Sequence, residues 1–249
     1  MNEIAINTVL ISGGAGSMGQ LVSDHINSRD DFILSAIYDP KYESQDYKSY
    51  NDLNEIKEDI VIEFSPSSAI NENLEHLLNS DADLIIGSSG ISSDMISKLK
   101  MIKDKKIIII PNFSIGAAYQ KLFSIALSKN FSSVNITEKH HSKKQDAPSG
   151  TAIDLANSLS SDLNSHNKDG EFYQSNLVNN KNIYSLRGED YLAEQVVDFI
   201  SEHESFKLEH KVDDRRAYLY GFKIVLDLFH ELEGFNFGLE NIIAEKINI

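Results

Sequence analysis

The chain has 249 residues, and its 23 lysine and arginine residues against 38 aspartate and glutamate residues give a net charge of −15 at neutral pH. Non-specific binding to nucleic acid or to an anionic membrane is not expected, because both depend on lysine and arginine to neutralise phosphate. There is no cysteine, which excludes disulfides and thiolate metal sites and suits a reducing cytosol.

The first part of the chain alternates predicted strands with predicted helices. Its N-terminus has no signal-peptide pattern, and no apolar run in the chain approaches the roughly 18 residues of a spanning helix, so we expect a soluble, cytoplasmic protein. Most of the strands are continuous apolar runs, which is typical of an α/β fold with a parallel sheet covered on both faces. The strands fall within 8–12, 32–40, 58–66, 82–90 and 105–114, and helices within 17–26, 71–80 and 93–102.

After Asn112 the pattern changes to helices and alternating strands, which indicates a second α+β domain on a mixed, open sheet. We expect helices over 116–131, 151–163 and 217–234, and strands within 134–141, 182–190, 191–203 and 204–212. The polar, asparagine-rich stretch from Ser165 to Lys181 is interpreted as a flexible loop. The helical segment at 217–234 is expected to rejoin the first domain.

The segment Gly14–Gly19 fits the pattern G-x-G-x-x-G and lies between a predicted strand and a predicted helix. Such a turn lets a pyrophosphate approach bare backbone and rest on the helix N-terminus. Asp39 lies 20 residues after Gly19, where a carboxylate binds ribose hydroxyls and favours NAD over NADP, although Lys41 is close enough to soften that preference. The alternative is a turn that only joins strand to helix. A P-loop would need lysine and serine or threonine where Gln20 and Leu21 stand.

Two further turns follow the fourth and fifth strands, at Gly87–Gly90 and Pro111–Ser114. In a doubly wound sheet these turns lie at the carboxyl edge, where ligands bind. By themselves they could equally be ordinary small-residue turns.

The segment EKHHSKKQDAPSGTA, residues 138–152, concentrates positive charge in an acidic chain. His140 and His141 point to opposite faces of a strand, so we expect no shared metal site. The helix start at Ser149–Thr151 offers N–H groups and hydroxyls to a carboxylate, and Lys144 could bring an ammonium to the same anion. A histidine with a lysine also supplies a proton donor and a charge stabiliser. The alternative is a solvated basic loop before a capped helix.

Together these residues resemble the 4-hydroxy-tetrahydrodipicolinate reductase (dihydrodipicolinate reductase) family of the diaminopimelate and lysine pathway. The resemblance runs from about Thr8 to the C-terminus and is weakest at 41–58 and in the asparagine-rich stretch. The basic segment is its most specific motif. The other matching motifs are GGAGSMG (13–19), IEFSP (62–66), GSSG (87–90) and PNFSIG (111–116).

The resemblance implies a Rossmann-type dinucleotide-binding domain of residues 1–113 and 217–249, a substrate-binding and oligomerisation domain of residues 114–216, and a homotetramer. It implies hydride transfer from NADH or NADPH to a cyclic, unsaturated imine dicarboxylate, which yields tetrahydrodipicolinate. His140 would be the acid/base residue and Lys144 the second proton donor. Residues implied to contact the substrate are His141, Ser149, Gly150 and Thr151. Residues implied to contact the cofactor are Gly13, Gly14, Ala15, Gly16, Ser17, Met18, Asp39, Phe64, Gly87, Ser88, Ser89, Ile110, Pro111, Asn112 and Phe113.

Three positions depart from the family pattern. Ser17 and Pro40 stand where the family often has arginines that would serve NADP, which favours NADH or dual use. Gln195 stands where a histidine is common. Arg187 and Arg215 match family positions without an assigned role. Two other functions stay open: a non-catalytic NAD-binding sensor or scaffold, and another amino-acid dehydrogenase on the same fold.

Overall fold

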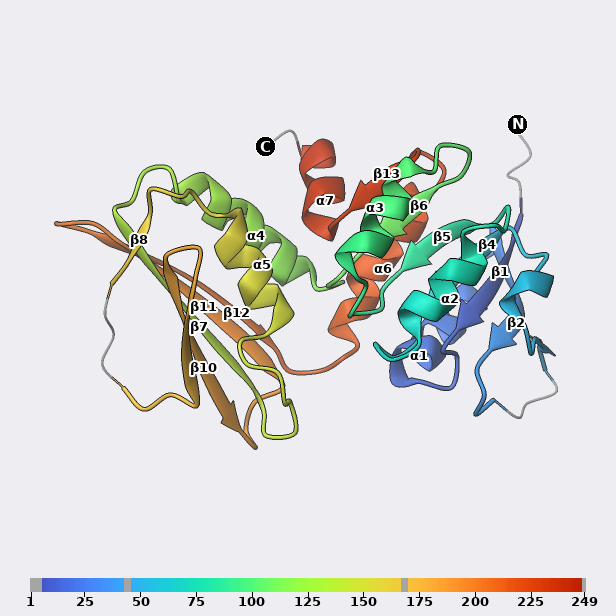
Figure 1. The fold of residues 1–249 in the computed structure, drawn as a ribbon, viewed down its shortest axis with the longest axis horizontal. Coiled ribbons are helices and arrows are strands. Elements are labelled where there is room, and N and C mark those ends of the chain that lie inside the picture. Colours follow the sequence, from blue (N-terminus) through green and yellow to red (C-terminus); the bar gives the residue numbers. More distant parts are fainter. Residues whose placement is uncertain (1–5, 43–45, 167–169, 248–249) are drawn as a thin grey trace. The chain divides into compact units, whose positions relative to one another are not determined.

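The computed structural model describes residues 6–42, 46–166 and 170–247. The chain divides into two compact units (Figure 1). Unit 1 comprises Met1–Phe113 and Gly221–Ile242, and unit 2 comprises Ser114–Tyr220 and Ile243–Ile249. No helix within the described ranges is long and apolar enough to cross a membrane.

Unit 1 is built on a seven-stranded sheet whose strands, as described, all pair in parallel, in the order β13-β6-β5-β4-β1-β2-β3. The predicted doubly wound α/β fold is therefore confirmed. Strand order reverses between β1 and β4, and in such folds ligands bind beyond the carboxyl ends of the strands at that point. The strands are β1 (Asn7–Ser12), β2 (Phe32–Tyr38), β3 (Lys48–Ser49), β4 (Ile60–Glu63), β5 (Asp83–Ile86), β6 (Ile107–Ile109) and β13 (Phe235–Phe237).

Helices cover both faces of this sheet, which is why its strands are apolar throughout. Alternate strand residues such as Leu10, Val61 and Ile86 form one buried cluster with Leu74 and Leu99 of α2 and α3. On the other face, α1 and α6 meet through His25 and Phe222, whose ring centroids lie 6.5 Å apart. The helices are α1 (Ser17–Ile26), α2 (Ile70–Leu77), α3 (Ser93–Met101) and α6 (Ala217–Leu228), with a 3-10 turn at Leu53–Glu55.

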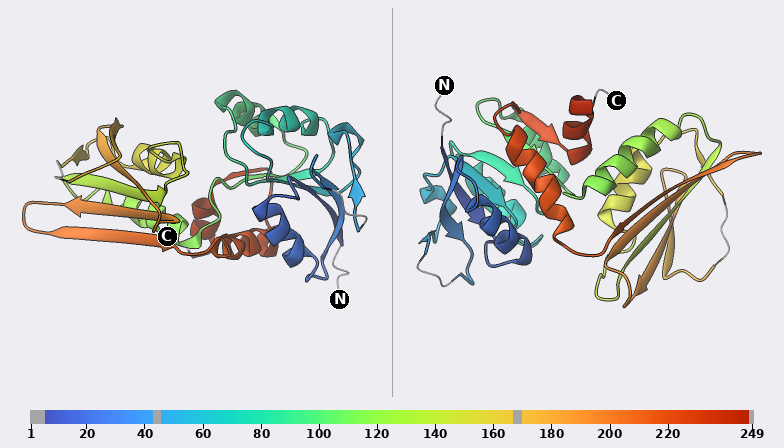
Figure 2. Two further views of the ribbon diagram at one scale, coloured as in Figure 1. Left: turned by 90° about the horizontal axis from the view of Figure 1, so that it is seen from below. Right: turned by 180° about the vertical axis from the view of Figure 1, so that it is seen from behind.

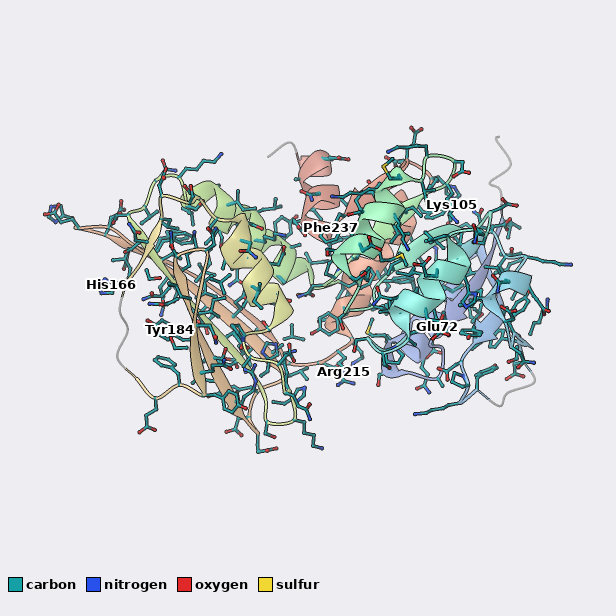
Figure 3. All side chains as sticks on the ribbon, viewed as in Figure 1. Glu72, Lys105, His166, Tyr184, Arg215 and Phe237 are labelled. Carbon is teal, nitrogen blue, oxygen red and sulfur yellow. The ribbon has the colours of Figure 1, made fainter. Side chains whose placement is uncertain are left out.

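One buried cation has a purely structural part in this unit. Lys105, labelled in Figure 3, is 8% exposed, and its ammonium donates to the carbonyl oxygens of Leu77 (2.8 Å) and Ser80 (2.6 Å). These carbonyls lie at the C-terminal end of α2 and just beyond it, where helix carbonyls lack partners and favour a positive charge. Burial lowers the pKa of Lys105.

Unit 2 is a mixed six-stranded sheet with two helices on one face. Its main path is β12-β11-β7-β10-β9, and β8 pairs with β7. Strands β7 and β10 are parallel, whereas β11 is antiparallel to both β7 and β12. Strands β11 and β12 form a long antiparallel ribbon (Figure 2). The strands are β7 (Ser133–His141), β8 (Asn164–Ser165), β9 (Gln174–Val178), β10 (Lys181–Gly188), β11 (Ala193–Ile200) and β12 (Ser205–Val212). The helices are α4 (Ile115–Leu127) and α5 (Gly150–Ser158), and α7 (Leu239–Ile247) crosses the boundary between the units.

The interpretation of 165–181 as a flexible loop is wrong for residues 174–181, whereas residues 166 and 170–173 lie in no helix or strand. This stretch contains β9, which pairs antiparallel with β10. Asn179 and Asn180 join the two strands with φ angles of 48° and 62°, a left-handed pair that asparagine tolerates and that matches the twist of a two-residue hairpin. Residues 167–169 lie outside the described residues.

Candidate active site

The glycine loop of unit 1 is a turn in which side chains would not fit. Gly13 has φ +80°, and a Cβ there would lie 2.7 Å from the carbonyl carbon of Phe64. A Cβ on Gly19 would lie 2.4 Å from the Gly13 oxygen. Gly16 is the N-cap of α1 and supplies no side-chain cap, so no capping side chain lies at this helix N-terminus, where an anion is favoured. The loop therefore fits a dinucleotide phosphate.

Asp39 follows β2 and holds the same loop. Its two carboxylate oxygens accept hydrogen bonds from the N–H groups of Ala15 (3.0 Å) and Lys41 (2.8 Å). Each carboxylate oxygen has more than one lone pair, so Asp39 can still accept hydrogen bonds from hydroxyl groups. Among the loop residues, Gly16 and Ser17 are exposed, whereas Ala15 and Met18 are half-buried.

The turns after β4, β5 and β6 are held together by aromatic packing. Phe64 and Phe113 lie 5.9 Å apart between ring centroids, and both contact Phe222 of α6. Gly87 is required there, because a Cβ would lie 2.3 Å from the Phe64 ring and 2.6 Å from the Phe113 ring. These predicted cofactor residues therefore share one edge of the sheet. Of the others, Ser88 and Ile110 are buried, Asn112 is half-buried, and Ser89 and Pro111 are exposed.

Sequence reasoning missed a buried polar cluster at the carboxyl ends of β1 and β4. Glu63 is fully buried and accepts hydrogen bonds from the N–H of Ser65 (2.6 Å) and the amide of Asn73 (3.3 Å). The hydroxyls of Ser12 and Ser65 lie 3.0 Å apart. The cluster fixes the turn that carries Phe64. An acidic residue inside the apolar run IVIE was the available signal.

In unit 2 the histidine strand places its side chains as alternation predicts. Val134 and Ile136 of β7 pack with α5 in one buried cluster, so Glu138 and His140 leave the strand on that same face and His141 on the other. Glu138 is fully buried, and its carboxylate accepts a hydrogen bond from Nδ1 of His140. The His140 side chain is 17% exposed. The predicted acid/base residue His140 and the predicted substrate contact His141 thus leave β7 on opposite faces.

Arg187 of β10 is the second partner of Glu138. It lies opposite His140 in the parallel pairing of β10 with β7, and its side chain is 5% exposed. Two guanidinium nitrogens donate to the two carboxylate oxygens of Glu138, at 3.1 and 3.0 Å. Burial raises the pKa of Glu138, but the hydrogen bonds from His140 and Arg187 outweigh it and lower the pKa to about 2. The carboxylate is therefore ionised at neutral pH.

Lys144 lies in the loop after β7, and Arg187 contacts its main chain. Its ammonium donates to Asp146 at 2.8 Å, and its side chain is 24% exposed. Arg187 also binds this loop, because it donates to the main-chain carbonyls of Lys144 (3.3 Å) and Asp146 (2.5 Å). His140, Lys144, Glu138, Arg187 and Asp146 therefore form one contiguous group.

At the Ser-Gly-Thr helix start, the structure shows a capping role for Ser149. The Ser149 hydroxyl is buried and accepts the N–H of Ala152 (3.3 Å), which caps α5. Ser149 thus serves the helix by its hydroxyl. Gly150 and Thr151 are exposed, and a Cβ on Gly150 would meet nothing within 4 Å. Their backbone N–H groups lie at the positive end of the helix, where a carboxylate is favoured.

Gln195 stabilises the packing of α4 on the sheet. Its amide donates to Gln120 Oε1 at 2.9 Å, and the Gln120 amide donates to the carbonyls of Gln195 (2.9 Å) and Leu208 (3.0 Å). Both glutamines are buried, so every polar group in this pair needs such a partner. The part of the chain that the structure describes contains no cluster of three or more histidine, aspartate or glutamate side chains able to hold a metal ion.

A doubly wound sheet with a bare glycine turn, together with a second unit that presents a histidine and a lysine beside a helix start, defines a dinucleotide-dependent oxidoreductase. Comparison with known proteins gives the family. The family model described as "Dihydrodipicolinate reductase, N-terminus" matches residues 7–113, and "Dihydrodipicolinate reductase, C-terminus" matches 116–243. The chain belongs to the dihydrodipicolinate reductase family.

Relatives named 4-hydroxy-tetrahydrodipicolinate reductase match over nearly their whole length. The protein from Lactobacillus acidophilus is 31% identical over 94% of this chain and 98% of its own. One from Coxiella burnetii is 32% identical over 96% of this chain and 100% of its own. A dipicolinate-bound dihydrodipicolinate reductase from Paenisporosarcina sp. TG-14 has the same fold, with a TM-score of 0.77, 24% identity, and coverage of 95% of this chain and 99% of that chain.

Glu138 makes the stability of the folded protein depend on pH in the acidic range. Because its pKa is lowered from 4.5 to about 2, its contribution to stability is present above the unfolded value and is lost as the pH falls toward 2. We expect the free energy of unfolding to fall more steeply from pH 4.5 to 2 in the wild type than in Glu138→Gln, with the difference reaching about 3 kcal/mol. Urea unfolding across this pH range measures both slopes, and equal slopes would contradict the assignment.

Proposed function

We propose that this protein reduces the 4-hydroxy-tetrahydrodipicolinate/dihydrodipicolinate ring to tetrahydrodipicolinate in diaminopimelate and lysine biosynthesis. The observation that carries the proposal is the group in unit 2, where the buried Glu138–Arg187 pair contacts the His140 side chain and the Lys144 main chain, and the family match extends through this segment. A dianionic ring accounts for cationic side chains concentrated in an acidic chain, because it must be attracted locally.

The residues of unit 1 fit a nicotinamide dinucleotide. The bare backbone of Gly13–Gly16 and the uncapped start of α1 would hold its pyrophosphate, and Asp39 its adenosine ribose. The turns at Gly87–Ser89 and Ile110–Phe113, with Phe64, would contact the nicotinamide side. When bound, the reduced nicotinamide supplies a hydride.

The residues of unit 2 would bind the ring and supply the proton. The N–H groups of Gly150 and Thr151 would donate hydrogen bonds to one carboxylate, and His141, the last residue of β7, would contact the substrate at the end of the strand. The ring gains an electron pair with the hydride, so a proton must follow, and His140 and Lys144 are the groups that can donate or share it. For the dihydrodipicolinate ring the sum is addition of two hydrogens across one double bond, whereas the 4-hydroxy form must also lose its hydroxyl group as water. From the family resemblance we also infer a cytoplasmic homotetramer.

Substitution of the proposed proton donors tests the reaction. With substrate generated by an aldolase and loss of reduced-nicotinamide absorbance as the readout, we expect wild-type turnover and a decrease in kcat of about 10²–10⁴ in Lys144→Ala. Lys143→Ala is the matched control, because it removes an exposed lysine from the adjacent position and should leave kcat near the wild-type value. A Lys144→Ala variant with near-normal turnover would remove Lys144 from the mechanism. A wild type that binds the dinucleotide but never turns over would favour a sensor.

The charge of Asp39 tests the cofactor preference. We expect kcat/KM with NADH to be at least equal to that with NADPH, since a carboxylate at this position repels the additional phosphate. Asp39→Asn removes the charge while retaining the shape, and should raise the NADPH-to-NADH ratio of kcat/KM about tenfold, the effect of roughly 1.4 kcal/mol. A strong wild-type preference for NADPH would refute the role given to Asp39.

A further inference from the structure

One buried ion pair contacts the side chain of His140 and the main chain of Lys144. Glu138 and Arg187 have side-chain exposures of 0% and 5%, and they are joined by two parallel hydrogen bonds, the strongest arrangement available to an arginine and a carboxylate. Removal of one partner from such a buried pair is costly, but apolar residues of similar volume in place of both partners often give equal stability. Stability alone therefore does not explain why this position holds an ion pair.

The carboxylate determines which nitrogen of His140 reacts. Glu138 is ionised and can only accept hydrogen bonds, so Nδ1 of His140 must carry a proton toward it. In the neutral ring this fixes the Nδ1–H tautomer, and Nε2 is then the atom that exchanges a proton with a substrate. The same contact also limits rotation of the ring, since a flipped imidazole would lose its bond to Glu138.

The guanidinium fixes the backbone that carries Lys144. Besides the two bonds to Glu138, Arg187 donates to the carbonyls of Lys144 and Asp146. Asp146 in turn accepts from the Lys144 ammonium. One planar side chain therefore connects the end of β7 to the loop that follows it, through a fork of five donors that the three donors of a lysine ammonium do not reproduce.

We propose that Glu138 and Arg187 are positioning residues of the reductase: Glu138 orients the His140 imidazole through Nδ1, and Arg187 fixes both that carboxylate and the Lys144 loop. This proposal rests on the proposed function of His140 and Lys144. The low pKa of Glu138 is consistent with it, since the carboxylate stays charged throughout the physiological range.

Kinetics of single and double variants test the positioning role. We expect Glu138→Gln to lower kcat at least tenfold with less than a threefold change in KM for the nicotinamide. In a His140→Ala background the same change should have almost no further effect on kcat, because Glu138 acts through His140. A structural role would lower kcat in both backgrounds. Arg187→Lys retains the charge but loses the bidentate fork, and it should lower kcat at least tenfold. This variant tests the positioning role even if Glu138→Gln does not fold.

Glu194→Gln is the matched control. Glu194 lies on the neighbouring strand β11, is 8% exposed and pairs with Lys139 at 3.0 Å. Lys139 is between Glu138 and His140 in sequence but points to the opposite face. Removal of this carboxylate should leave kcat within twofold of wild type. Folded Glu138→Gln with kcat within twofold of wild type, or an equal loss in Glu194→Gln, would overturn the proposal.

NMR gives a readout that does not depend on turnover. A histidine Nδ1 proton held by a carboxylate resonates far downfield, so we expect such a signal in the wild type and in Glu194→Gln. It should be absent from His140→Ala and Glu138→Gln. If the signal behaves in this way but no variant or wild type reduces the ring, the proposed function fails and the orientation of His140 stands. A wild type without the signal would refute the positioning role directly.

Discussion

A buried negative charge on Glu138 is the constraint on which the rest of unit 2 depends. An isolated carboxylate is costly to bury, so the fold must bring cations to it. The parallel register of β7 and β10 does so, since it sets Arg187 opposite His140. The bonds from Arg187 to the following loop then fix the position of Lys144 relative to the histidine strand. The contacts of Glu138 and Arg187 therefore link the strand register to the loop conformation and to the placement of both proposed donors.

The cofactor-edge turns of unit 1 depend on a different constraint, which is the absence of side chains at their glycines. Gly13, Gly19 and Gly87 lie where a Cβ would come within 2.7 Å of another atom, so bulk is excluded by the protein's own packing around the turns. Asp39 adds order, because it binds the loop through Ala15. The unit thus presents a preformed backbone surface suited to phosphates, and preorganisation of this kind reduces the entropy lost on binding.

Much of the fold could be predicted from sequence, because both parts of the chain have clear periodicity. Apolar runs bounded by glycine and proline located β1, β2, β4, β5 and β6, and strict alternation located β7 together with the opposite directions of His140 and His141. The hairpin at Asn179–Asn180 was missed because its polar strand β9 lacks an apolar face. The short strand β13 was missed because its three residues pair with β6, a partner distant in sequence.

The site was predicted less completely than the fold. Local motifs identified the glycine loop and the basic segment, whereas Glu138 could have been noticed only by its position two residues before His140. Arg187 could not be connected to them, because strand register is a tertiary property. The Ser149 hydroxyl caps α5, the usual role of serine at that position, and its contact with a ligand stays a prediction.

The central claim is that a cationic group beside the start of α5 captures a ring dicarboxylate. A crystal structure with pyridine-2,6-dicarboxylate tests it most directly. The account predicts one carboxylate on the N–H groups of Gly150 and Thr151, the ring within reach of His140 Nε2, and the Lys144 ammonium turned from Asp146 to the ligand. A ligand bound elsewhere, with Lys144 still paired to Asp146, would contradict it.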